Sequence, residues 1–205
     1  MSTGLYDSTY EHDACGVGMV ADLWGRADHD IVDRALTVLE RLAHRGASGA
    51  EVSTGDGAGI LVQVPHRFLV GAAERAGFSL PAAGSYAVGL AFLPTEPDDT
   101  AKAKATVEIL AAEEELAVLG WREVPISPEG LGQTARHAMP VLQQVFVTAA
   151  GGPDDADGPD GNVDTMALER QAFVLRKRAE HAVDGLYFPS LSARTLVYKL
   201  SLIHI

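Results

Sequence analysis

The hydrophobic and polar positions of the chain follow two periods, one typical of helices and one typical of strands. Between Asp30 and His44, apolar residues recur every three or four positions, which predicts a helix. Asp28 or Asp30 can cap its start, and Arg45-Gly46 is predicted to end it. Strands are predicted from shorter apolar runs at 15–23, 58–64, 85–93 and 141–149.

Three further stretches read as helices. The first covers residues 65–76, begins with a proline and is closed by Gly77. The second is the Ala- and Glu-rich stretch 98–119, and the third covers residues 163–183. Residues 121–126 predict one more strand, and 185–199 predict strand and turn. This mixture points to an α/β or α+β layered domain. The pattern leaves open whether the strands pair in parallel or antiparallel.

Charge and length narrow the classes of function. A chain of 205 residues with a net charge of −12 forms one large domain or two small ones, and its charge disfavours binding to nucleic acid or to anionic membranes. No apolar run approaches the roughly 20 residues that span a bilayer. The first residues have neither the basic start nor the apolar stretch of a secretory signal. With one cysteine no internal disulfide forms, and a reducing cytoplasm is the expected location.

That single cysteine, Cys15, is the first candidate for chemistry. It stands between a polar leader, residues 1–14, and an apolar run that contains Gly16 and Gly18. Glycines at these positions permit close approach of a substrate or of another backbone. If the leader is cleaved after Ala14, Cys15 carries both a thiol and a free α-amine, whose ordinary pKa of about 7.7–8.0 suits a general base. This is the arrangement of N-terminal nucleophile enzymes. The alternative is a buried structural cysteine.

Arg45 is the second candidate. Its planar guanidinium can hold a substrate carboxylate with two hydrogen bonds, and it is followed by a glycine-rich loop. The alternative is an arginine that offsets the dipole at the end of a helix.

Three other motifs are not interpreted as ligand or metal sites. The stretch TGDGAG has no lysine and precedes a strand, so it is not a phosphate-binding P-loop. The acidic stretch 151–162 does not fit the spacing of a calcium loop and is interpreted as a solvated loop. The histidines show no metal-ligand spacing, which with one cysteine disfavours zinc.

Residues 4–69 carry a dense resemblance to a known family. The stretches GLYDSTYEHDACGVGMVADLWGR and HDIVDRALTVLERLAHRGASGAEVSTGDGAGILVQVPHRFL look like the start of glutamate synthase large subunits. The resemblance continues more loosely through MPVLQQVFV, the 163–183 helix and GLYFPSLSARTLVYK, so it reaches Lys199.

The resemblance implies an α+β fold, the N-terminal nucleophile hydrolase fold, built as a four-layer αββα sandwich and incomplete here at the C-terminus. Residues 1–14 become a propeptide, 15–199 a partial class II glutamine amidotransferase domain, and 200–205 a tail unrelated to the family. Cys15 becomes the catalytic nucleophile that releases ammonia from L-glutamine. The arginine of the family's HRG motif maps to Arg45, near the nucleophile and the substrate.

The resemblance also implies partners and cofactors. In full-length glutamate synthase the ammonia aminates 2-oxoglutarate at an FMN beside an iron–sulfur cluster, in the remainder of the large subunit. A small subunit often supplies electrons from NADPH; ferredoxin is the other donor. No cofactor or metal is expected in the 205 residues themselves. The family's oxyanion-hole asparagine and glycine lie downstream, so the chain alone is predicted to be a weak or inactive glutaminase.

Two alternatives remain. One is a different class II amidotransferase, which the 14-residue leader disfavours, because those enzymes usually start with the cysteine directly after Met. The other is a binding or regulatory module that retains its leader and in which Cys15 is structural.

Overall fold

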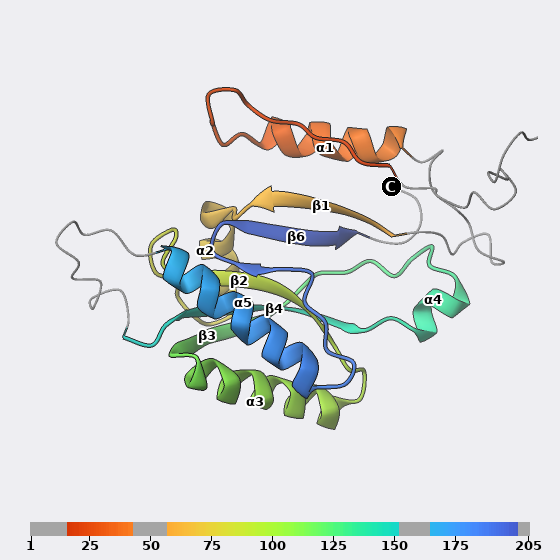
Figure 1. Ribbon diagram of the computed structural model, residues 1–205. Helices are drawn as coiled ribbons and strands as arrows, with labels where there is room; N and C mark the ends of the chain where they lie inside the picture. Colours follow the sequence, from red (N-terminus) through yellow and green to blue (C-terminus); the bar gives the residue numbers. More distant parts are fainter. Residues whose placement is uncertain (1–15, 43–56, 152–164, 201–205) are drawn as a thin grey trace, which may run out of the picture. The chain divides into compact units, whose positions relative to one another are not determined.

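The computed structural model describes residues 16–42, 57–151 and 165–200 (Figure 1). Its helices are α1 (His29–Arg41), α2 (His66–Arg75), α3 (Pro97–Glu113), α4 (Gln133–His137) and α5 (Thr165–Ala182). Its strands are β1 (Ala58–Gln63), β2 (Ala87–Leu93), β3 (Leu116–Glu123), β4 (Val141–Ala149), β5 (Leu191–Ser192) and β6 (Thr195–Leu200).

The chain divides into two compact units. The N-terminal unit comprises Met1–Ala58, Gly130–Arg136 and Leu200–Ile205. The sandwich unit comprises Gly59–Glu129 and His137–Lys199.

Two sheets form the sandwich unit. The larger has the strand order β3-β4-β2-β5, and all its pairings are antiparallel, which decides the direction that the sequence left open. Its central pair, β2 and β4, is in register from Ala87 opposite Val147 to Leu93 opposite Val141. The smaller sheet pairs β1 with β6, whose arrows point in opposite directions in Figure 1.

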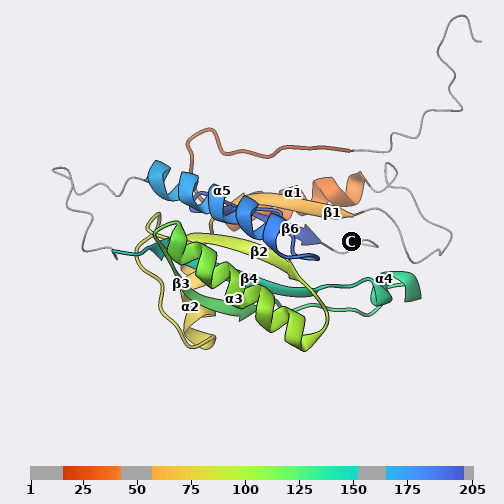
Figure 2. The ribbon, with the colours of Figure 1, turned by 60° about the horizontal axis from the view of Figure 1, so that its bottom comes forward.

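One face of the four-stranded sheet is covered by α3 and α5, which lie side by side (Figure 2). Side chains on alternate positions of β2 and β4, such as Ala91 and Val145, point into this layer. They pack with Val107 of α3 and Leu175 of α5, and all four residues have less than 2% of their surface exposed. This helix layer buries the larger of the two hydrophobic clusters.

The other face of the same sheet packs on the two-stranded sheet. Tyr86, Val88 and Phe146, which have no exposed surface, meet Leu196 of β6 and Leu69 of α2 there. Because β2 is covered on both faces, its sequence is almost continuously apolar instead of alternating. The order of layers is therefore helices, four-stranded sheet, two-stranded sheet.

Most predicted elements are confirmed within a few residues. The strand at 141–149 and the helix that Gly77 closes are found, and Gly77 has the positive φ of +91° that its place after a helix requires. Asp28 caps α1, where its side chain accepts the N–H of Asp30.

The predicted strand at 15–23 is wrong over the residues described. Residues 16–22 have no regular secondary structure, and Val17 and Met19 are 94% and 90% exposed. A strand is stabilised by pairing with a neighbour, and no described strand pairs with these residues.

Two predicted boundaries and one further element also need correction. The helix predicted to end at Arg45-Gly46 ends at Arg41, with Leu42 as its cap. The helix predicted over 98–119 ends at Glu113, because Glu115 takes a left-handed φ of 56° and β3 begins at Leu116. The strand predicted at 121–126 is therefore the end of β3. The short helix α4 was not predicted.

Candidate functional site

Both predicted site residues, Cys15 and Arg45, lie outside the described residues, and so does the leader 1–14. The described residues nearest to them in sequence are Gly16, which follows Cys15 directly, and Leu42, which precedes Arg45 by three positions. The geometry around the candidate site is therefore that of residues 16–42, all within the N-terminal unit.

Residues 16–22 lie along α1 (Figures 1 and 2). A Cβ placed on Gly16 would be 3.0 Å from Leu42 Cδ2, and one on Gly18 would be 2.3 Å from Val38 Cγ1. Gly16 and Gly18 are two positions apart, and Val38 and Leu42 are one helical turn apart, so the two pairs match in spacing. A side chain at position 18 would displace Val38.

This packing explains the glycine spacing of the sequence. The glycines beside Cys15 were predicted to permit close approach of a substrate or of another backbone. In the structure, what approaches them is the helix that leads toward Arg45. Among the described residues, the neighbours of the two predicted site residues are thus in contact with each other.

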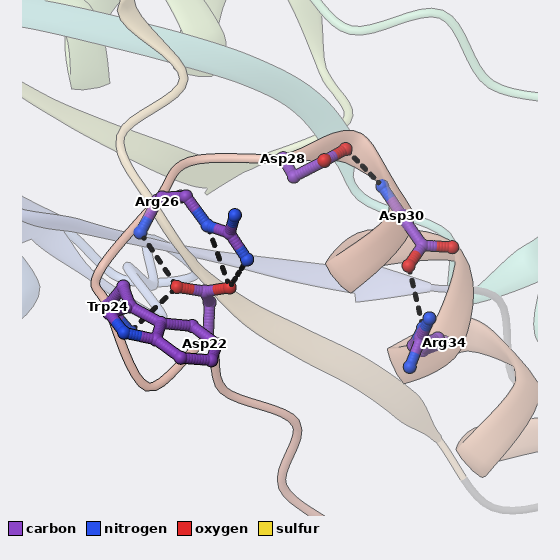
Figure 3. A network of polar contacts seen from close by, with 6 residues as sticks. All are labelled: Asp22, Trp24, Arg26, Asp28, Asp30 and Arg34. Atoms are coloured by element: carbon purple, nitrogen blue, oxygen red, sulfur yellow. Dashed lines mark hydrogen bonds and ion pairs between the residues drawn. The ribbon is translucent and has the colours of Figure 1, made fainter.

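Residues 16–22 and α1 are the two arms of a hairpin, residues 16–42. A compact turn joins these arms (Figure 3). The Asp22 carboxylate accepts the backbone N–H groups of Trp24 at 2.8 Å and Arg26 at 3.1 Å. It also accepts hydrogen bonds from Nε and Nη2 of the Arg26 side chain, at 3.2 and 2.8 Å. The guanidinium of Arg26 lies 5.1 Å from the centre of the Trp24 ring. One carboxylate therefore fixes the whole turn.

The electrostatics of the turn follow from these contacts. The side-chain hydrogen bond from Arg26 is the largest cause that lowers the pKa of Asp22. Asp28 then caps α1 at a distance of 3.0 Å from the Asp30 nitrogen, and Asp30 pairs with Arg34 at 2.7 Å (Figure 3). The carboxylates near the start of α1 also suit the positive end of the helix dipole.

Sequence reasoning missed the role of Asp22 and Arg26 in this turn. An aspartate followed two and four residues later by its donors is the signal that could have found it. Within the described ranges, no group of three or more His, Cys, Asp or Glu side chains is placed to hold a metal ion. No described helix is long and apolar enough to cross a membrane.

Comparison with known proteins adds an independent finding. The family model for class-II glutamine amidotransferases matches residues 15–204, so the match begins at Cys15.

Curated relatives are similar over nearly the whole chain. The glutamate synthase (NADPH) large chain of Bacillus subtilis (strain 168) is 40% identical over 200 residues, which are 96% of this chain and 12% of the relative. The ferredoxin-dependent glutamate synthase 1 of Arabidopsis thaliana is 39% identical over 204 residues, 95% of this chain and 12% of the relative.

The glutamate synthase (NADH) of Schizosaccharomyces pombe is 36% identical over 198 residues, 95% of this chain and 9% of the relative. The chain therefore spans between 9% and 12% of the length of these relatives.

Proposed function

Because the chain belongs to the class-II glutamine amidotransferases, we propose that it is the glutaminase part of a glutamate synthase large subunit, with Cys15 as its nucleophile. The observation that carries the proposal is the family match, which starts at Cys15 and leaves residues 1–14 outside it. The similarity to glutamate synthases over 92% or more of the chain supports the assignment of this particular member of the family.

The chemistry of the proposal needs a mature chain that begins at Cys15. After removal of residues 1–14, the α-amine takes the thiol proton and the sulfur bonds to the side-chain amide carbon of glutamine. The C–N bond then breaks, and the nitrogen leaves as ammonia with a proton that the α-amine returns. Water attacks the thioester, the S–C bond breaks, and glutamate and the free thiol are formed.

Arg45 binds the substrate in this proposal. Its guanidinium holds a carboxylate of glutamine with two hydrogen bonds, which positions the side-chain amide for attack. The contact of Gly16 with Leu42 supports this assignment, because the chain leaves that contact toward Cys15 on one arm and toward Arg45 on the other.

For the fold we propose the four-layer αββα sandwich of N-terminal nucleophile hydrolases. The sandwich unit has helices, sheet and sheet in that order, which supports the proposal. The fourth layer, a second layer of helices, is the part that the proposal adds. The domain limits, 1–14 for the propeptide, 15–199 for the domain and 200–205 for a tail, remain predictions; the family match runs to residue 204.

The activity of a whole glutamate synthase also remains a proposal for this protein. The ammonia would aminate 2-oxoglutarate in the remainder of the large subunit, where FMN and the iron–sulfur cluster would lie, with electrons from a small subunit or from ferredoxin. A cluster of this kind is held by several cysteines, and this chain has one. Its residues therefore do not fit the cluster.

A single variant tests the proposed role of Cys15. In the large subunit, Cys15→Ala is expected to lower glutamine-dependent glutamate formation by about 10⁴-fold or more, because the nucleophile is lost. Ammonia supplied from solution bypasses that step, so ammonia-dependent glutamate formation in the same preparation is the internal control and should persist. Loss of both activities together would instead indicate a structural cysteine, and retention of both would exclude Cys15 as the nucleophile.

A further inference from the structure

A cavity of 330 Å³ opens in the sandwich unit, at the end of β1. Gln63 and His66 form one wall, Gly84 a second, and Arg194 and Thr195, in the connection from β5 to β6, a third. The volume lies at the lower end of the range of small-molecule sites, about 300–1,000 Å³. All the residues that line it belong to the sandwich unit.

Backbone hydrogen bonds hold two of these walls together. The Val64 N–H donates to the carbonyl of Arg194 at 3.0 Å, and the His66 N–H donates to the carbonyl of Val64 at 2.9 Å. The Ser192 hydroxyl accepts the N–H groups of Arg194 and Thr195 at 3.0 and 3.1 Å. The cavity is therefore formed by the fold before any ligand arrives.

Other contacts fix the remaining wall and the strand connection. Ser85 N–H donates to the Ala82 carbonyl at 3.1 Å, which closes the turn that contains Gly84 with its φ of +85°. Glu169 of α5 accepts the Ser192 hydroxyl at 2.8 Å and the Ala193 N–H at 3.0 Å. The Glu169 carboxylate is thus engaged with the strand connection and does not line the cavity.

The charge of the lining contrasts with that of the whole chain. The chain has a net charge of −12, but no Asp or Glu lines the cavity, while Arg194 and His66 do. The Arg194 side chain is exposed, and its guanidinium has no hydrogen-bond or ion-pair partner among the described residues. No protein acceptor in that part of the chain therefore competes with a ligand for its donors.

His66 is held in position by Tyr86. Its Nδ1 lies 3.2 Å from the Tyr86 hydroxyl, and the two ring centres are 5.8 Å apart. Tyr86 has no exposed surface, and burial raises the pKa of its phenol to about 12. The imidazole of His66 therefore lines the cavity in a fixed place and offers a further hydrogen-bonding group to a ligand.

We propose that this cavity binds a small oxyanion, a carboxylate or a phosphate, through Arg194 and His66. Guanidinium groups bind both kinds of anion with paired hydrogen bonds, and Thr195 and Gln63 offer further polar groups. The residues that line the cavity belong to the sandwich unit, whereas the N-terminal unit includes Cys15 and Arg45, the residues proposed for the glutaminase chemistry.

Titration of the 205-residue chain tests this site. Inorganic phosphate and succinate are added at constant ionic strength and pH 7, and binding is followed by calorimetry. Saturable binding of one or both anions supports the site. The anion that binds more tightly shows whether the site prefers a phosphate or a carboxylate. Absence of saturable binding of either anion would overturn the proposal.

Matched variants separate a site from general charge attraction. Arg194→Gln is expected to weaken binding about tenfold or more, because a charge-assisted pair of hydrogen bonds is lost. Arg75→Gln removes the same charge from α2 without touching the cavity and should bind as the wild type does. Equal weakening by both variants would contradict the proposal.

Amide spectra of the wild type keep the test independent of any variant that fails to fold. Addition of the bound anion should shift the backbone N–H resonances of Gly84, Arg194 and Thr195. Shifts that are confined to other residues would show that the anion binds elsewhere and would overturn the proposal.

Discussion

The hairpin of residues 16–42 and the sandwich unit are stabilised in opposite ways. In the hairpin no residue is buried, and Val17, Leu23 and Trp24 are 78% or more exposed. Its turn is held by polar contacts between residues two to four positions apart, such as those of Asp22 with Arg26. In the sandwich unit, side chains far apart in sequence close two apolar clusters.

The difference assigns stability to one region and the proposed glutaminase chemistry to the other. Burial of apolar side chains is the dominant favourable term in folding, so the sandwich unit supplies most of the stability. The hairpin leads to both residues of the proposed glutaminase site but contributes little burial. Segments with few buried contacts open at low cost, and functional residues are commonly found on them. Changes in the two regions should therefore affect different measurements.

The largest effect is expected in the sandwich unit. Phe146 has no exposed surface, and its ring centre lies 5.3 Å from that of Phe78 and 6.2 Å from that of Tyr86. Phe146→Ala should lower the free energy of unfolding by about 3–5 kcal/mol, measured with urea. The matched control is Phe173→Ala, at a residue 56% exposed on α5, which should change it by about 0.5 kcal/mol or less. Similar losses would contradict the location of the core.

A change in the hairpin should affect activity more than stability. In the large subunit, Gly18→Ala forces the new methyl group against Val38 and displaces the segment that follows Cys15. A displacement of about 1 Å near a nucleophile can cost about 10²-fold in rate, so glutaminase kcat should fall by up to that factor.

The matching second-site change identifies the cause. Val38→Ala removes the methyl carbon that lies 2.3 Å from the added Cβ and leaves Val38 Cβ at 3.5 Å, an ordinary contact. The double variant should therefore recover most of the lost kcat, while Val38→Ala alone keeps it. If the double variant is as slow as Gly18→Ala, the packing of this segment on α1 is not what positions it.

The smallest effect is a dependence of stability on pH within the sandwich unit. Burial by itself raises the pKa of Glu180, but hydrogen bonds from Lys177, the Phe188 N–H and Arg176 together lower it below its ordinary value of 4.5. A carboxylate with a lowered pKa in the folded state stabilises the fold above pH 4.5, and this contribution is lost as the pH falls through the folded pKa.

Glu180→Gln should remove that contribution. The variant is expected to be less stable than the wild type at pH 7, and the difference should narrow as the pH falls below 4.5. Urea unfolding at several pH values measures it. A difference that stays constant over this range would assign the effect to packing and not to charge.

Local signals were sufficient for much of the fold. The 3.6-residue period of α1, the Asp28 cap and the glycine after α2 depend on neighbours in sequence, so each could be predicted. Residues 116–119 could not, because their helical propensity is overridden by pairing of Leu116 and Val118 with β4. The antiparallel direction of the sheets is likewise set by contacts between distant residues.

The candidate site shows the same division. Cys15 and Arg45 were singled out from the sequence, the resemblance to the family assigned their roles, and both lie outside the described residues. The glycines after Cys15 were recognised as sites of close approach, but their partners, Val38 and Leu42, were not predictable. A one-dimensional pattern shows that space is needed and does not show what fills it.

Cys15 is proposed to become residue one and to act as the nucleophile. Mass spectrometry of the mature large subunit, after incubation with an electrophilic analogue of glutamine, examines both steps in one experiment. We expect a chain that begins at Cys15 and carries a single analogue on that residue. A chain that still begins at Met1 or Ser2, with Cys15 unlabelled, would refute the proposed role.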